Sequence, residues 1–161
     1  MRIGKLITSL ALALPFAAQA RGLQPGWGGL AWGDPPARDM QRLEGSEAGL
    51  SYYKRESDPK TFCHFTVGTR YLFYKNRLIS VGLSGFAEEM LKAEGCLKDR
   101  WGSATLAPGG SLVWLENGTQ ARLEARPPER GGGFHVMIIS KKLWAWFEEE
   151  DRKSKAPTSP R

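Results

Sequence analysis

The residues best able to do chemistry in this sequence are a serine, two histidines and two cysteines. Ser84 falls between a predicted strand and a predicted helix, where the nucleophile elbow of a hydrolase, Gly-x-Ser-x-Gly, places its serine. Gly82 fits that pattern, but Phe86 stands where the second glycine belongs. A hydroxyl at a strand-to-helix junction is more simply a helix cap. With His64 and His135 as the only histidine bases, the sequence assigns no catalytic residue.

The two cysteines, Cys63 and Cys96, are an even number in a chain that carries an export signal, described below. An oxidising compartment favours their pairing, with two buried reduced thiols as the alternative. Cys63 and His64 cannot act as nucleophile and base if they lie in a strand, because neighbouring side chains there point to opposite faces. Two Cys and two His without paired spacing match no zinc motif. We therefore predict a disulfide, no metal and no cofactor, and leave open a pair of carboxylates of the glycosidase kind.

Six tryptophans are many for 161 residues. Trp27 lies in a Gly-rich lead-in, while Trp144 and Trp146 point about 200° apart on a predicted helix, so that they cannot both face one core. An indole left exposed is a stacking platform for a sugar, a peptide or a partner protein, and packing in the core is the alternative. We predict binding through Trp27 and through one of Trp144 and Trp146. Core packing is expected for the remaining ones, Trp32, Trp101 and Trp114.

Residues 1–20 have the three parts of a secretory signal peptide. Arg2 and Lys5 form the positive start, residues 6–17 are the apolar stretch, and Ala18-Gln19-Ala20 is a small-x-small cleavage site. The apolar stretch is shorter than the roughly 20 residues that a membrane span needs, and an uncleaved anchor is the alternative. We predict a periplasmic or secreted protein without stable membrane insertion after cleavage.

The charge pattern narrows the class of partner. The whole chain has a formal net charge of +6, and removal of residues 1–20 leaves 21 Lys and Arg against 17 Asp and Glu. These charges are mixed along the chain without a long basic run, so we predict no nucleic-acid partner. An envelope protein or an acidic envelope polymer remains as the expected partner.

About 140 mature residues suffice for a single domain with its own core. A first helix is predicted after Asp34 and Pro35, ending at Gly45. Strands are predicted near 50–56, 61–67, 70–75, 77–83, 111–116, 119–125 and 134–139, with Asn117-Gly118 as a hairpin turn. Helices are predicted over 86–100 and from Leu143 onward. This pattern indicates an α+β domain over residues 21–153, with two or three helices packed on one face of antiparallel meanders and a disordered tail at 154–161.

Three short motifs occur in a fixed order: Trp32-Gly33-Asp34 at the start of the first predicted helix, an aromatic hairpin over 71–81, and Leu97 leading to Trp101-Gly102. In this the chain resembles a group of small exported bacterial proteins of unknown function, over roughly residues 27–143. Here Asp34 replaces the usual hydroxyl cap and Trp101 replaces a tyrosine. The resemblance implies no catalytic residues. We expect a non-enzymatic binding protein of the bacterial envelope, with a small periplasmic or secreted hydrolase as the alternative.

Overall fold

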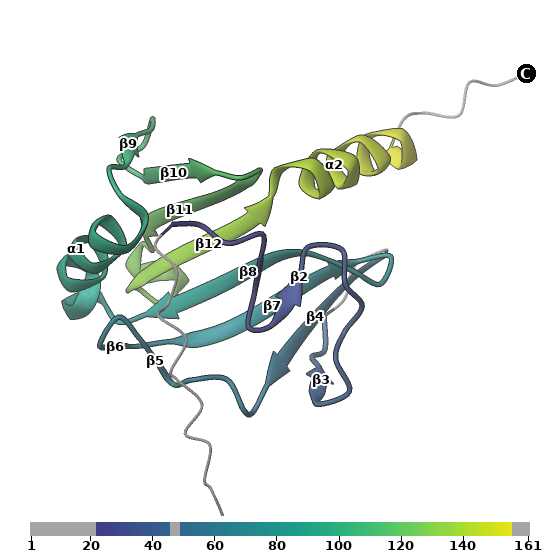
Figure 1. Ribbon diagram of the computed structural model, residues 1–161, viewed down its shortest axis with the longest axis horizontal. Coiled ribbons are helices and arrows are strands. Elements are labelled where there is room, and N and C mark those ends of the chain that lie inside the picture. The colour runs from purple at the N-terminus through teal and green to yellow at the C-terminus, as the bar shows by residue number, and fades with distance from the viewer. Residues whose placement is uncertain (1–21, 46–48, 156–161) are drawn as a thin grey trace, which may run out of the picture.

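The computed structural model describes residues 22–45 and 49–155 (Figure 1). The predicted signal peptide lies outside these residues. The strands are β1 (Gly26–Trp27), β2 (Leu30–Ala31), β3 (Met40–Arg42), β4 (Leu50–Arg55), β5 (Thr61–Phe62), β6 (Phe65–Thr66), β7 (Gly68–Tyr74), β8 (Arg77–Gly85), β9 (Thr105–Leu106), β10 (Leu112–Glu116), β11 (Thr119–Ala125) and β12 (Phe134–Ser140). The helices are the 3₁₀ helices η1 (Ala87–Glu89) and η2 (Pro128–Arg130) and the α-helices α1 (Met90–Trp101) and α2 (Lys141–Lys155).

Eight strands form one antiparallel sheet in the order β3-β4-β7-β8-β12-β11-β10-β9. Each half of the chain supplies three long strands followed by an α-helix, β4-β7-β8-α1 and then β10-β11-β12-α2, and the last strands of the two halves pair at the centre. Two small ribbons, β1–β2 and β5–β6, stand apart from this sheet. The predicted α+β class with an antiparallel sheet is confirmed.

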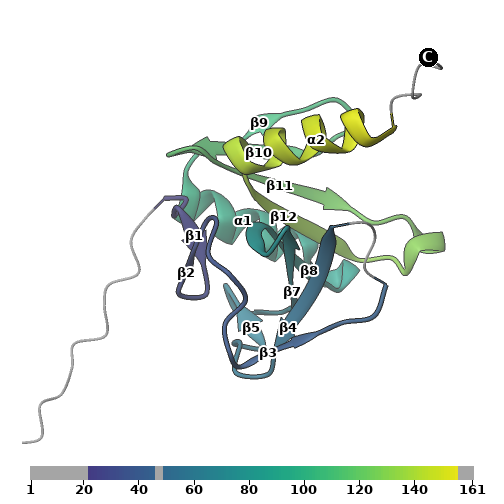
Figure 2. The same cartoon turned by 90° about the vertical axis from the view of Figure 1, so that its right-hand side faces the viewer.

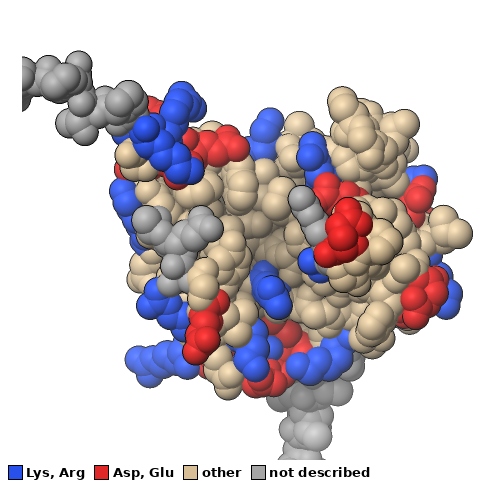
Figure 3. Space-filling model, turned by 180° about the vertical axis from the view of Figure 1, so that it is seen from behind, with Lys and Arg blue, Asp and Glu red and all other residues tan. Residues whose placement is uncertain are grey.

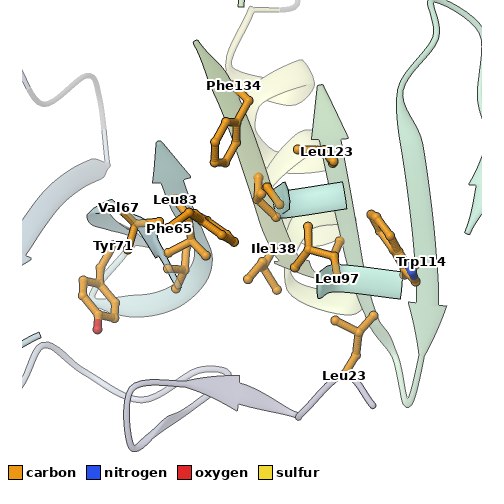
Figure 4. Packing of buried hydrophobic residues seen from close by; sticks show 14 of the residues in the cluster. Leu23, Phe65, Val67, Tyr71, Leu83, Leu97, Trp114, Leu123, Phe134 and Ile138 are labelled. Atoms are coloured by element: carbon orange, nitrogen blue, oxygen red, sulfur yellow. The ribbon is translucent and has the colours of Figure 1, made fainter. Parts of the chain in front are cut away.

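The core lies on the face of the sheet that carries α1. Residues directly opposite each other in paired strands share a face, and one such row contains only side chains that are at most 2 % exposed. It consists of Tyr71, Val81, Ile138, Ala121 and Trp114. Ala93 and Leu97 of α1 are also fully buried, and Figure 4 shows Leu97 between side chains from both halves of the sheet. The β1–β2 ribbon crosses the same side of the sheet (Figures 1 and 2).

The disulfide between Cys63 and Cys96 is present as predicted, but its setting differs from the prediction. Residues 61–67 do not form one central strand. Cys63 and His64 instead make the two-residue turn between β5 and β6, with φ of 53° and 65°. Both central residues of such a turn need positive φ, which favours Gly and Asn. The disulfide therefore ties α1 to the β5–β6 ribbon rather than to the main sheet.

The first predicted helix, from Asp34 to Gly45, is wrong. Residues 34–39 form turns and irregular chain, and β3 follows. The physical reason is the Pro35-Pro36 pair, because a residue that precedes proline is pushed out of the helical region. Asp34 does accept a hydrogen bond from the Ala31 N–H (2.8 Å), but it caps a turn. The Trp32-Gly33-Asp34 motif thus does not open a helix here.

The other predicted strands are present within two residues at each end. Gly95 lies inside α1 without breaking it, and α2 begins at Lys141, two residues before its predicted start. α2 continues through Lys155, which is two residues into the predicted tail, and the rest of that tail lies outside the described residues. In the part of the chain that the structure describes, neither helix is long and apolar enough to cross a membrane.

Candidate functional site

The face of the sheet opposite the core, here called the open face, carries a polar and half-buried row. Its members lie directly opposite one another on five strands: Arg70, Gly82, Met137, Arg122 and Val113. Arg70 is exposed and the other four are half-buried, in contrast to the core row beside them. Figure 3 shows the molecule from this side as hollowed, with basic side chains in and around the hollow.

Gly82 leaves the middle of this row without a side chain. A Cβ at this position would lie 2.7 Å from Nε2 of His135, so the imidazole lies across bare backbone. Burial lowers the pKa of His135, Glu124 opposes that shift, and Arg126 and Arg70 lower the pKa further. The histidine is therefore neutral at pH 7, and the charge around it comes mainly from arginines.

Arg122 is a side chain of the open face that needs a hydrogen-bond acceptor. Its Nε is buried and has no hydrogen-bond partner among the described residues. A buried donor without an acceptor costs about 1–3 kcal/mol, and the cost is higher for a charged group. A carboxylate or phosphate placed over the hollow would remove this cost and would be attracted by Arg70 as well.

A second row of the open face contains Ser84, His135 and Glu124, directly opposite one another on β8, β12 and β11. Ser84, which was expected to cap a helix, lies inside β8. A serine, a histidine and a carboxylate in one row have the composition of a hydrolytic triad. Within residues 22–45 and 49–155, however, no hydrogen bond joins Ser84 to His135, whose Nε2 lies over Gly82.

The backbone around Ser84 also lacks what a hydrolase needs. β8 is paired on both sides, with β7 and with β12. Its N–H groups therefore serve the sheet, whereas an oxyanion hole requires N–H groups aimed at the reacting oxygen. This row therefore has the residue types of a hydrolytic triad, but within the described residues it has neither the Ser84–His135 hydrogen bond nor N–H groups free to form an oxyanion hole.

The predicted binding residues Trp144 and Trp146 are both half-buried on α2. The Trp146 ring packs against Tyr74 with 5.0 Å between centroids, and the Lys75 ammonium lies 5.7 Å from its centre. Trp144 packs against Phe147 at 5.5 Å and donates its indole N–H to Glu148 (2.8 Å). Neither indole is fully covered, which fits the argument that both cannot face one core.

α2 lies beside the open face. Tyr74, Leu72 and Arg70 lie two residues apart along β7, and residues two apart in a strand share a face. Trp146 and Phe147 pack on Tyr74 from that side, at centroid distances of 5.0 Å each. α2 therefore packs on the same side of the sheet as the row of Arg70 and Arg122.

Trp27 is not part of this surface. It lies in β1 on the core side of the sheet, is half-buried, and packs against Phe62 at 5.2 Å between centroids. It also lines a cavity of about 650 Å³ beneath the β1–β2 ribbon. The structure thus brings Trp144 and Trp146 together and separates them from Trp27. Contact of these tryptophans with a ligand stays a prediction.

Sequence reasoning missed Arg70, Gly82, Arg122 and Met137. Arg70, Gly82 and Arg122 lie at polar or small positions of alternating strands, which was a usable signal for the face that they occupy, whereas Met137 lies among apolar residues and gave no such signal. Which strands are neighbours was not readable, so the four could not be placed in one row. In the described part of the chain, no cluster of three or more His, Cys, Asp or Glu side chains could hold a metal.

Comparisons with protein-family models, with curated proteins and with solved structures found no match to this chain.

Proposed function

We propose that this is an exported, non-enzymatic binding protein of the bacterial envelope that takes an acidic segment of a partner protein on the open face. The observation that carries the proposal is the row Arg70-Gly82-Met137-Arg122, an uncovered part of a central sheet with arginines on both sides of a glycine. An antiparallel sheet can leave one face to solvent, so the two arginines of this row, and not its exposure, support the proposal.

The arginines of the open face favour an acidic partner. Arg70 and Arg126 act electrostatically on His135, as does the carboxylate of Glu124, and Arg122 lies one row away on β11. Arginine binds carboxylates in a planar, two-bonded geometry, and the buried Nε of Arg122 needs such an acceptor. Trp144 and Trp146 add apolar contact from α2.

The test is affinity capture from the host's own envelope fraction with the mature wild-type protein and two variants. The variant Arg70→Glu/Arg122→Glu reverses the charge of the hollow, and Lys92→Glu makes the same kind of change on the exposed side of α1. We expect the double variant to lose the captured protein, and Lys92→Glu to retain it. A synthetic peptide with the acidic segment of that protein should then bind wild type about tenfold or more tightly than the double variant, with salt weakening the binding.

Equal capture by wild type and by the double variant would refute the proposal. Trp146→Ala tests the contribution of α2 separately, because it leaves both arginines in place; we expect weaker capture with a folded protein.

The alternative, a small hydrolase, is favoured only by the row of Ser84, His135 and Glu124. A fluorophosphonate probe reacts with activated serines, so it separates the two functions directly. We expect no labelling of Ser84. Labelling that Ser84→Ala abolishes would establish the hydrolase instead. Membership of the group of small exported proteins with a Trp-Gly motif remains part of the same proposal.

A further inference from the structure

The cavity beneath the β1–β2 ribbon is a separate site on the core side of the sheet. It has a volume of about 650 Å³, within the range of about 300–1,000 Å³ that small-molecule sites occupy. Leu83 and Ile138 of the sheet, Phe62 and Trp101 at the side, and Trp27 of the ribbon line it. Figure 4 shows Leu83 and Ile138 facing the same space from neighbouring strands. We propose that this cavity binds a small apolar molecule that carries a hydrogen-bond donor, an amine or a hydroxyl, at one end.

The β1–β2 ribbon forms the roof of the cavity, and hydrogen bonds fix the chain at both ends of this roof. This favours a small molecule over a protein segment as the ligand. The Gly22 N–H donates to the Arg100 carbonyl (2.9 Å) at one end. The Arg55 guanidinium donates to the Gly28 carbonyl (2.7 Å) at the other. A folded segment would have to break these bonds to enter, whereas a chain or a ring system fits beneath them.

Gly28 lets the roof come close to the polar end. It has φ of 59°, and a Cβ there would lie 2.5 Å from the Tyr71 hydroxyl oxygen. Only glycine combines this conformation with this contact. The ribbon is thus built to close over Tyr71.

The polar end contains an acceptor without a donor. Tyr71, whose pKa burial raises, donates its hydroxyl proton to Oδ1 of Asp58 (2.8 Å). Oδ2 of Asp58 is buried and has no hydrogen-bond partner within the described residues. Asp58 also lines the cavity. Buried polar atoms are nearly always satisfied, so a ligand with an N–H or O–H group suits this end and a carboxylate does not.

The opposite end is lined by Arg100, whose guanidinium carbon lies 5.1 Å from the centre of the Phe62 ring. An anionic head group at this end is the rival orientation. The two orientations predict opposite preferences between an amine and a carboxylate of the same chain length.

The experiment titrates the mature, disulfide-bonded protein with N-phenyl-1-naphthylamine, an apolar probe with one N–H group whose fluorescence rises in apolar surroundings. Dodecylamine and dodecanoate below their micellar concentrations, and 1-dodecanol below its solubility limit, then compete with the bound probe. We expect dodecylamine to displace the probe at a concentration at least about tenfold lower than dodecanoate does. No rise in fluorescence would overturn the site, and equal or better displacement by dodecanoate would overturn the assigned head group.

Two variants locate the bound probe. Leu83→Trp fills the cavity from its floor, and Thr61→Trp fills it from the exposed strand β5, where the core is unaffected. We expect both to weaken probe binding about tenfold or more, while Leu115→Trp, on the exposed edge of β10, leaves it unchanged. Unchanged binding in a folded Thr61→Trp variant would overturn the proposal.

Asp58→Asn tests the head group, because the amide keeps an acceptor for Tyr71 but loses the negative charge. We expect the preference for dodecylamine over dodecanoate to fall to near one, and a retained preference would contradict this role of Asp58. Arg70→Glu/Arg122→Glu alters only the other side of the sheet and should bind the probe like wild type. The two sites are therefore tested independently.

Discussion

At the residue scale, two glycines have opposite effects on stability. Gly85 lies directly opposite Phe134, and a Cβ on it would overlap the Phe134 ring, which is fully buried. Gly95 lies on the exposed side of α1, where a Cβ would meet nothing within 4 Å. The first glycine is needed for packing, and the second only weakens a helix.

This contrast gives a matched pair of substitutions. Gly85→Ala should lower the free energy of unfolding by about 1–3 kcal/mol, the usual cost of overpacking a core. Gly95→Ala should raise it by about 1 kcal/mol, the helix propensity difference. Urea denaturation of both variants measures the two effects, and a neutral Gly85→Ala would show that β8 and β12 are not paired in this register.

His135 predicts a pH effect of defined sign. Burial lowers its pKa in the folded protein below the ordinary value of 6.5, so the unfolded chain binds more protons in that range. The contribution of His135 to stability is therefore complete above about pH 6.5 and is lost as the pH falls toward the folded pKa.

Denaturation of wild type and His135→Gln between pH 7.5 and 5 isolates this contribution. We expect the variant to lose less stability than wild type over that interval. His64→Gln, at the exposed turn between β5 and β6, is the control and should follow wild type. Identical curves for His135→Gln and wild type would contradict the burial of the imidazole.

At the element scale, the disulfide supports the part of the fold that has few long-range hydrogen bonds. The β5–β6 ribbon has only two paired residues on each strand, and Cys63 joins it to Cys96 across 33 positions of sequence. In the chain-entropy model a loop of this size contributes about 4 kcal/mol.

Reduction, or the double variant Cys63→Ser/Cys96→Ser, should therefore lower the free energy of unfolding by about 4 kcal/mol or somewhat less. Denaturation with and without reductant measures this change. The mass of the exported protein after alkylation, with no reductant added, tests the bond itself. Two alkylated thiols in that sample would contradict it.

At the scale of the whole molecule, the residues that follow the predicted signal peptide are part of the packed fold. The structure's first described residues already contribute to packing, since Leu23 is 2 % exposed and its N–H donates to Glu116 (2.7 Å). The predicted cleavage after Ala20 leaves this segment intact. Intact-mass measurement of the exported protein should give a chain that begins at Arg21. A mass that includes residues 1–20 would support the uncleaved anchor instead.

The whole sheet also separates the two proposed sites. One face carries α1 and the cavity, while the other carries the row of Arg70 and Arg122 and the contacts of Trp146 and Phe147 with Tyr74. Ligands on the two faces are separated by the thickness of the sheet. The two proposals therefore need not share a ligand.

Local sequence determined the elements whose causes are local. Asn117-Gly118 predicted a hairpin turn and with it the strand over residues 119–125, which is β11, because positive φ is a property of a few adjacent residues. An even cysteine count predicted the Cys63–Cys96 bond. The predicted first helix was wrong because Pro35-Pro36 disfavours helical backbone more strongly than a cap at Asp34 favours it. The predicted strand around Cys63 was also wrong. Cys63 lies in a turn whose two residues have positive φ, and because neither is a glycine the local sequence did not indicate a turn.

Only the tertiary structure decided the candidate sites. Arg70 and Arg122 lie in different halves of the chain, and they share a row because β8 pairs with β12 at the centre of the sheet. The cavity likewise needs Trp27, Phe62 and Ile138 from three distant segments. Strand alternation fixes on which face a side chain lies, but strand order depends on how both halves bury their apolar faces together. That is a property of the whole chain, and no short stretch of sequence contains it.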